Sequence, residues 1–500
     1  MPSLLGIDNG LTVTKAVIFD VSGNVLSVAR RRVPQLLPKP HHVERDMEEL
    51  WQATAAAITE AITLSGRPAT DIAAVAATAH GDGLYLLDAS RRPLGPGILS
   101  LDSRAGGIVS GWGPFAAKAL SLTGQIPHAS APAALLAWIK ANEPERFAKI
   151  AHILSCKDWL RFCLTGQIAT DSTEASTSFT DVQTQTYTPE ALRLYGLQAL
   201  HHTLPRILHP AAIAGFITPA AAALTGLKAG TPVAAGLHDV TASALGIGGH
   251  AEGTVAIVAG TYSINEVVSA QPKTNPAWFC RNAITPGQWN NMAISPASAA
   301  NYDWFLETLC APDLQTHGPA IHQTLAPEIT DALNRPSTLL FHPYLYGSPH
   351  GPLASASFLG LRGWHTRGDM LRAVLEGITF NHRTHIDALR AGFPVTQARL
   401  TGGLTRNKAF AQMFADVLNM PVTTSQTEEA AAWGAALCAG AAIGIYASPL
   451  NDPRDLAPLS ETFAPDPTRA AQYEVRYRLH CKVADALAPL WPEIEALADA

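Results

Sequence analysis

A glycine-containing turn between two short apolar strands occurs near the start of each half of this 500-residue chain. Residues 3–33 alternate as strands do, and turns at Asn9-Gly10 and Ser22-Gly23-Asn24 break the run, which predicts a three-stranded antiparallel meander. Residues 254–269 repeat the pattern as a strand, a Gly260-Thr261 turn and a second strand. The repetition indicates two lobes that each open with a turn large enough to hold a phosphate group.

Apolar spacing over the rest of the chain predicts both strands and helices, as in an α/β protein, and the length of 500 residues suggests two large domains or three ordinary ones. The boundary is expected near residues 246–252, which are rich in turn formers, so the predicted domains are 1–248 and 249–500. The Pro-rich stretch 447–467 is expected to be a surface connection. Buried strands are predicted over 74–80, 232–239 and 398–403, and helices over 48–64, 132–142, 156–165, 407–418, 428–444 and 468–497.

Composition excludes several classes of protein. Charged residues make up 15% of the chain and the formal net charge is -6, which disfavours a globally basic nucleic-acid binder. The six cysteines form no CxxC pair, which indicates reduced thiols and argues against structural zinc. Asp8 interrupts the first apolar run, against a signal peptide, and the apolar stretch 430–445 is shorter than the ~20 residues of a membrane span. We expect a cytoplasmic protein without membrane or nucleic-acid partners, and its oligomeric state stays open, with a homodimer as one option.

The segment 8–15, Asp-Asn-Gly-Leu-Thr-Val-Thr-Lys, carries groups suited to binding a phosphate. Gly10 lets backbone N–H groups approach a ligand, Thr12 adds a hydroxyl and Lys15 adds a positive charge. Asp8 is placed to hold Mg²⁺, directly or through water. Because Asn-Gly is also the commonest hairpin signal and the P-loop pattern is absent, a plain turn is the alternative.

The apolar run 232–239 ends on a carboxylate, Asp239. Because α/β sheets bind ligands at the carboxyl ends of their strands, Asp239 is placed to accept a proton from a substrate hydroxyl. The alternative is a carboxylate that caps a helix beginning near Val240. The residues alone leave these two interpretations equal.

Further glycines allow the backbone to approach a ligand at Gly260-Thr261 and at Gly402-Gly403, although an ordinary turn is the simpler explanation of each. Polar residues that follow apolar strands are either ligands of a polyhydroxylated molecule or solvated loop residues: His80, Asp82, Asp102 and Arg104. His80 and His238 lack a third partner at helical spacing, which argues against a metal site.

Taken together, six segments resemble the FGGY family of carbohydrate kinases in order and spacing. The resemblance covers nearly the whole chain, and it rests on the set, because each segment alone is weak. The six segments are 8–15, 155–176, 232–248, 259–263, 400–422 and 428–440.

The resemblance implies an ATP-dependent kinase with two ribonuclease-H-like, actin-like domains and a nucleotide and sugar cleft between them. It implies that the first domain binds the sugar and provides Asp239 as the catalytic base, while the second binds the adenine nucleotide. Asp8 would lie near Mg²⁺ and the transferred phosphate. His80, His238 and Asp102 would contact the sugar together with Asp239.

The same resemblance implies which residues surround ATP. They are Gly10, Thr12, Lys15, Gly260, Thr261, Gly402, Gly403 and Asn407. This chain departs from the family pattern at two of the neighbouring positions. Leu11 stands where the hairpin usually has the first of two hydroxyl residues, and Asp303 stands where glycerol kinases keep a glutamine near the adenine.

Within the family, residues 43–104 and 345–361 most resemble L-xylulose kinases, which implies a ketopentose such as L-xylulose or xylulose, phosphorylated at a terminal hydroxyl. Erythritol kinases share Gly81-Asp82-Gly83, so erythritol or another polyol is the alternative acceptor. An actin-like or chaperone-like ATPase switch would share the hairpins but lack a sugar pocket. An NAD-dependent dehydrogenase is disfavoured, because no GxGxxG follows the first strand.

Overall fold

The computed structural model describes residues 2–351, 353–427 and 429–499, so positions 1, 352, 428 and 500 lie outside the described residues. The chain divides into two compact units. Unit 1 consists of Met1–His250, Val268–Asn291 and Thr427–Asp455, and unit 2 of Ala251–Val267, Met292–Gln426 and Leu456–Ala500. This division differs from two contiguous domains, because two later segments of the chain belong with unit 1.

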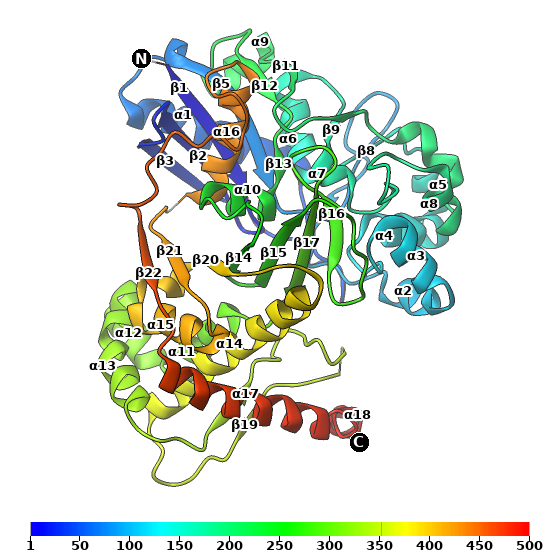
Figure 1. Cartoon of the computed structure of the whole chain (residues 1–500). Coiled ribbons are helices and arrows are strands. Elements are labelled where there is room, and N and C mark those ends of the chain that lie inside the picture. The colour runs from blue at the N-terminus through cyan, green and yellow to red at the C-terminus, as the bar shows by residue number, and fades with distance from the viewer. Residues whose placement is uncertain (1, 352, 428, 500) are drawn as a thin grey trace. The chain divides into compact units, whose positions relative to one another are not determined.

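Unit 1 is built on a mixed sheet with the strand order β11-β12-β5-β1-β2-β3, and β13 also pairs with β5. The predicted meander is confirmed, since β1 pairs antiparallel with β2 and β2 with β3; Figure 1 draws these strands in blue. The strands are β1 Ser3–Asn9, β2 Val13–Asp20, β3 Val25–Arg32, β5 Ile72–Ala79, β11 Ile213–Phe216, β12 Pro232–Ala234 and β13 Leu237–His238.

Helices cover both faces of this sheet. On one face lie α1 Met47–Ser65 and α6 Cys156–Thr165, whose Leu50, Ile58 and Trp159 are buried in one core with strand residues Leu5 and Ile7. Asp46 caps α1 by accepting the Glu49 N–H, as expected for an acidic residue at a helix start.

On the other face lie α10 Asp239–Gly246 and α16 Ala430–Ala442, which Figure 1 draws in green and in orange, respectively. The helix predicted over 428–444 is therefore confirmed for Ala430–Ala442, and it is buried, while position 428 lies outside the described residues. Across the described part of the chain, no helix combines the length and apolar character needed to cross a membrane.

A second, smaller core of unit 1 packs alongside the sheet and supplies polar loops to its edge. Its helices include α4, which begins and ends where the sequence predicted. The elements of this part and its connections are β4 Glu44–Arg45, β6 Tyr85–Leu87, β7 Gly97–Ile98, α2 Gly106–Gly111, α3 Ala116–Thr123, α4 Pro132–Asn142, α5 Pro144–Phe147, β8 His152–Leu154, β9 Thr170–Asp171, α7 Ser172–Ala175, α8 Pro189–Leu194, β10 Ile207–Leu208, α9 Pro219–Thr225 and β16 Phe279–Asn282.

Unit 2 is built on neighbouring strands in the order β15-β14-β20-β21-β22. β14 pairs antiparallel with β15 and parallel with β20, so the predicted strand-turn-strand repeat is confirmed. Its strands and helices are β14 Thr254–Ala259, β15 Ser263–Ser269, β17 Trp289–Ser295, α11 Ala299–Leu309, α12 Ala311–His317, α13 Ile321–Leu333, β18 Leu340–His342, β19 Ser357–Leu359, α14 Arg367–Gly392, β20 Gln397–Thr401, α15 Lys408–Leu418, β21 Val422–Ser425, β22 Ser460–Phe463, α17 Pro467–Leu487 and α18 Trp491–Glu495.

Three predicted elements differ from the structure. The strand expected over 232–239 is broken between β12 and β13, where Gly236 adopts a left-handed φ of 77° and its backbone lies against Ala77. The helix expected over 468–497 ends with α17 at Leu487 and continues as the short α18. The connection expected over 447–467 contains β22, which pairs with β21 and so adds a strand to the sheet.

Candidate active site

Three strand ends in unit 1 bring together polar residues that are far apart in the sequence. β1 runs parallel to β5 with Asn9 opposite Ala79, and β13 pairs with β5 so that His238 is also opposite Ala79. Asp8, His80 and Asp239 therefore lie at one edge of the sheet, at the carboxyl ends of its parallel strands. Ligands of open α/β sheets bind at this edge.

Asp239 is the first residue of α10 and not its N-cap, which is His238. Its carboxylate accepts the N–H of Val240 at 2.8 Å and that of Gly81. The side chain is 31% exposed, so a ligand can reach it. Burial and then the negative charge of Asp8 raise the pKa of Asp239 from 3.8 to about 7. A carboxylate with this pKa can both take up and release a proton near neutral pH.

Lys15 joins two carboxylates beside this edge. Its Nζ lies 3.3 Å from Oδ2 of Asp8 and 3.1 Å from Oε2 of Glu429, and Glu429 is also paired with Arg30. Burial raises the pKa of Asp8 although Lys15 opposes the shift. The positive charge predicted for Lys15 is thus present next to Asp8, but it is shared with Glu429.

The predicted phosphate turn is an intact hairpin between β1 and β2. Gly10 N–H donates to the Val13 carbonyl at 2.9 Å, and the Thr12 side chain belongs to an exposed residue. The carbonyl oxygens of Gly10 and Leu11 accept hydrogen bonds from the buried guanidinium of Arg45. Arg45 therefore holds the backbone of the turn through these two carbonyl groups, while Thr12 remains accessible to a ligand.

Two buried imidazoles flank Asp239. The Nε2 of His80 lies 3.3 Å from the Tyr85 hydroxyl, and the backbone N–H of His238 donates to Oγ1 of Thr173 at 2.9 Å. Burial lowers the pKa of both His80 and His238 to about 3, so both rings are neutral near pH 7. Neutral imidazoles can donate to and accept from the hydroxyl groups of a sugar.

Asp102 has a different environment from the one predicted. Its two oxygens accept hydrogen bonds from the Arg104 guanidinium and from the Val43 N–H at 2.7 Å, and its side chain has no exposed surface. Arg104 also binds Glu44 at 2.6 Å. The structure therefore places Asp102 in a buried ion-pair network that holds its loop, and a contact between Asp102 and the sugar stays a prediction.

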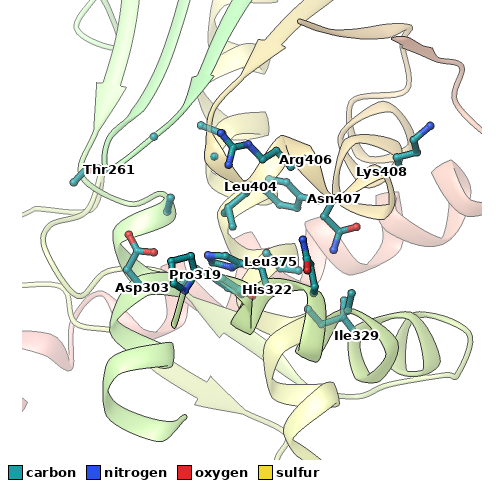
Figure 2. Close-up of a pocket in the computed structure, with 18 residues that line it drawn as sticks. Thr261, Asp303, Pro319, His322, Ile329, Leu375, Leu404, Arg406, Asn407 and Lys408 are labelled. Atoms are coloured by element: carbon teal, nitrogen blue, oxygen red, sulfur yellow. The ribbon is translucent and has the colours of Figure 1, made fainter. Parts of the chain in front are cut away.

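Unit 2 contains a cavity of about 600 Å³, within the range of small-molecule sites. Figure 2 shows Leu404 and Asn407 on one side of it and Pro319 and His322 on the other. The residues that line it are Ala259, Gly260, Thr261, Ala299, Tyr302, Asp303, Pro319, His322, Gln323, Ala326, Ile329, Leu375, Gly403, Leu404, Arg406, Asn407, Lys408 and Phe410.

Parallel pairing brings the two predicted glycine turns of unit 2 to this cavity. Val258 of β14 is opposite Thr401 of β20, so the turns at Gly260-Thr261 and Gly402-Gly403 follow neighbouring strand ends. Gly402 has a φ of 133°, and a Cβ there would be 2.2 Å from the Ala259 carbonyl oxygen, whereas a Cβ at Gly403 would meet nothing within 4 Å. Gly402 thus permits the strand contact, and Gly403 leaves space at the cavity.

Asn407 and Asp303, both noted in the sequence, also line the cavity. The Asn407 side chain accepts the Ala409 N–H at 3.0 Å and so caps α15. Burial raises the pKa of Asp303, and the adjacent Glu307 adds to the shift. These polar groups lie among apolar residues, which is the composition expected where a flat ring binds.

Sequence reasoning missed residues that reach the site from distant segments. Arg281 lies beside His238 with its Nη1 3.4 Å from Nε2, and Glu429 binds Lys15. His322 and Arg406 line the cavity of unit 2. Glu429 and Arg406 belong to segments that carried the family resemblance, which was their one signal; Arg281 and His322 carried none.

Within the described residues, no three His, Cys, Asp or Glu side chains form a group that could hold a metal ion. Mg²⁺ in nucleotide sites is commonly held by one or two carboxylates together with the substrate phosphates. Asp8, which lies at the end of β1 on this sheet edge, supplies one such carboxylate. The residues present therefore fit a magnesium ion that is bound mainly through ATP.

Comparisons with known proteins agree with this arrangement. Residues 3–246 match the N-terminal domain of the FGGY family of carbohydrate kinases, and residues 255–443 match its C-terminal domain. The L-xylulose/3-keto-L-gulonate kinase of Escherichia coli (strain K12) is 34% identical over 489 residues, covering 97% of each chain. The erythritol kinase of Brucella abortus (strain 2308) is 32% identical over 514 residues, covering 98% of this chain and 97% of the relative.

A solved structure supports the same fold. The xylulose kinase of Rhodospirillum rubrum matches with a TM-score of 0.86 at 29% identity, covering 98% of this chain and 99% of that one. The expected two-domain actin-like architecture is therefore confirmed.

Proposed function

Because this chain belongs to the FGGY family of carbohydrate kinases and is an ATP-dependent sugar kinase, we propose that its acceptor is a ketopentose of the L-xylulose type, phosphorylated at a terminal hydroxyl. The observation that carries this proposal is the position of Asp239, which is accessible, has a pKa of about 7 and lies at the same sheet edge as the neutral His80 and His238. A polyhydroxylated ligand needs such a mixture of donors and acceptors.

Asp239 acts as the general base in this proposal. It accepts the proton of the attacking hydroxyl while the oxygen of that hydroxyl forms its bond to the γ-phosphorus of ATP and the bond to ADP breaks. In phosphoryl transfer the protein contributes mainly positioning and charge stabilisation, so one well-placed base is sufficient. The N–H groups of Val240 and Gly81 hold the carboxylate in place for this role.

Unit 2 binds the adenine nucleotide in its cavity of about 600 Å³. The backbone at Gly260 and Thr261 is suited to the phosphates, and the space at Gly403 and Asn407 is suited to the adenosine. In unit 1, Gly10, Thr12 and Lys15 of the hairpin are suited to binding phosphate groups. Asp8 would hold Mg²⁺ together with the phosphates, and the ion would supply positive charge to neutralise them.

A polyol such as erythritol is the alternative acceptor, supported by Gly81-Asp82-Gly83 and by the similarity to an erythritol kinase. An ATPase switch that needs no acceptor is a different class of function. Such a switch would not need a group of residues suited to binding an acceptor, such as Asp239 with the neutral His80 and His238 in unit 1.

Sugar-dependent ADP release tests the proposal. L-xylulose, D-xylulose, D-ribulose, erythritol and glycerol are compared by kcat/KM, with product analysis to locate the phosphate. We expect L-xylulose to be best and glycerol poor, because a site built to bind several hydroxyls leaves polar groups unpaired with a smaller ligand. A higher kcat/KM for erythritol than for every ketopentose would contradict the proposed acceptor. ADP release that no acceptor changes would favour the ATPase switch.

A further inference from the structure

A buried arginine stands next to the candidate base. Arg281 comes from β16, and its side chain is only 1% exposed. Its guanidinium binds the Asp82 carboxylate at 3.0 and 3.2 Å and the Gln125 side-chain oxygen at 3.0 Å. It also lies 4.9 Å from the centre of the Phe279 ring. These contacts fix the guanidinium beside His238, the residue that precedes the base.

Asp82 is held in an unusual backbone conformation for this contact. Its φ is 56°, in the left-handed region, within the turn that connects His80 to Gly83. Burial alone would raise the pKa of Asp82, but Arg281 and then His128 outweigh it and keep that pKa well below its usual value. Asp82 is therefore ionised at neutral pH, and the positive charge of Arg281 is compensated.

The other groups near the base offer little attraction to a negative ligand. His80 and His238 are neutral near pH 7, and Asp8 and Asp82 both repel negative charge from the position of Asp239. Arg45 is engaged with the Asn9 side chain and with backbone carbonyls. A carboxylate on the acceptor would have to displace Asp82 from Arg281, which would leave the mostly buried Asp82 carboxylate with only the His128 imidazole beside it.

We propose that the Asp82–Arg281 pair is a charge filter in the acceptor site, which admits neutral sugars and polyols and excludes sugar acids. The inference rests on the proposed function, because it assumes that the acceptor binds beside Asp239. Asp82 is the selecting element, since its charge decides whether Arg281 is available to an anionic group. Arg281 supplies the positive charge that would attract such a group if Asp82 did not compensate it.

Asp82→Asn tests the filter. Asn has the same shape as Asp and tolerates the left-handed backbone, so the turn is retained while Arg281 loses its counter-charge. Binding of L-xylulose and of 3-keto-L-gulonate is measured by calorimetry without ATP. We expect the affinity for the acid relative to the neutral sugar to rise at least ~10-fold over the wild type. The double variant Asp82→Asn/Arg281→Gln should lose this gain.

Asp88→Asn is the matched control, because it removes a carboxylate from the surface of the same unit, where Asp88 pairs with Arg92 at 3.8 Å. Its affinity ratio should equal that of the wild type. If Asp82→Asn does not fold, Asp82→Gly removes the same charge at a left-handed position where glycine is favourable.

The outcomes separate the filter from the proposed function. The filter would be overturned if the affinity for the acid relative to the neutral sugar did not change in the Asp82 variants. It would also be overturned if the gain in this relative affinity persisted in the double variant without Arg281, or if neither compound bound to any variant. If no neutral sugar stimulates ADP release, the proposed function fails, and the calorimetric ratio still decides whether Asp82 selects by charge.

Discussion

Gly81 lies directly against the imidazole of His238: a Cβ at position 81 would come within 1.7 Å of the His238 Nε2 atom. The same residue donates its backbone N–H to the Asp239 carboxylate. The loop after β5 and the strand end before α10 are therefore fitted to each other at the candidate base. Any side chain at position 81 must move one of them.

Gly81→Ala should lower kcat/KM for the acceptor by about 10²-fold, because a displacement near 1 Å of a reacting group can cost that much. Steady-state ADP release measures the loss. Gly107→Ala is the control, since a Cβ at Gly107 meets nothing within 4 Å and alanine favours the α2 helix. Equal activity of the two variants would contradict a tight contact at Gly81.

Asp239→Asn should abolish most transfer, with a loss of about 10²–10⁴ in kcat. Because the pKa of Asp239 is about 7, wild-type kcat/KM for the acceptor should rise with pH up to about 7 and then level off. The residual activity of the variant should lack this rise. A pH–rate profile of both proteins checks the assignment, and a variant with more than about a tenth of the wild-type kcat would remove Asp239 from the role.

The same variant should be more stable than the wild type at pH 8. The pKa of Asp239 is about 7 in the folded protein and about 3.9 in an unfolded chain. As pH rises between these values the unfolded chain ionises first, so the wild type loses stability over this window and does not regain it above. Asparagine avoids the loss.

Thermal unfolding at pH 5 and pH 8 measures this difference. Since the carboxylate is partly exposed, we expect a gain of about 1–3 kcal/mol at pH 8 and less at pH 5. A difference independent of pH would show that Asp239 does not titrate near neutrality.

Lys15→Met should destabilise the protein by about 1–3 kcal/mol, because Asp8 loses its cation and Glu429 keeps only Arg30. It should also raise the KM for ATP. Lys118→Met is the control: Lys118 is 58% exposed and pairs with Glu190 on the surface, where such pairs contribute about 0–1 kcal/mol. Thermal unfolding and ATP kinetics of both variants are compared, and similar losses in both would argue against a special role for Lys15.

Gly403→Leu should weaken binding of ADP at least ~10-fold while the thermal stability without ligand changes little. The reason is that a Cβ at Gly403 meets nothing within 4 Å and the residue lines the cavity of unit 2. Gly402→Ala should instead lower the unfolding temperature, because its Cβ would collide with Ala259. Calorimetry and thermal unfolding distinguish the two, and normal ADP binding by Gly403→Leu would place the nucleotide elsewhere.

Local patterns in the sequence were sufficient to place the elements that carry the site. The meander, the second strand-turn-strand repeat and the buried helix α16 were all predicted, because strand alternation, turn glycines and an apolar run are properties of neighbouring residues. The break in the strand at Gly236 was not predicted, because the apolar pattern of the run does not show whether a glycine within it adopts a left-handed φ.

The sequence by itself determined the family, the fold class and the strand-end positions of Asp8, His80 and Asp239, because each depends on short-range order along the chain. Only the tertiary structure decided what surrounds them. It brought Arg281 to Asp82 and Glu429 to Lys15, and it placed Asp102 in an ion pair with Arg104. Charges and burial act through space, so the pKa of Asp239 and the pairing of each charged group depend on contacts between segments that are distant in sequence.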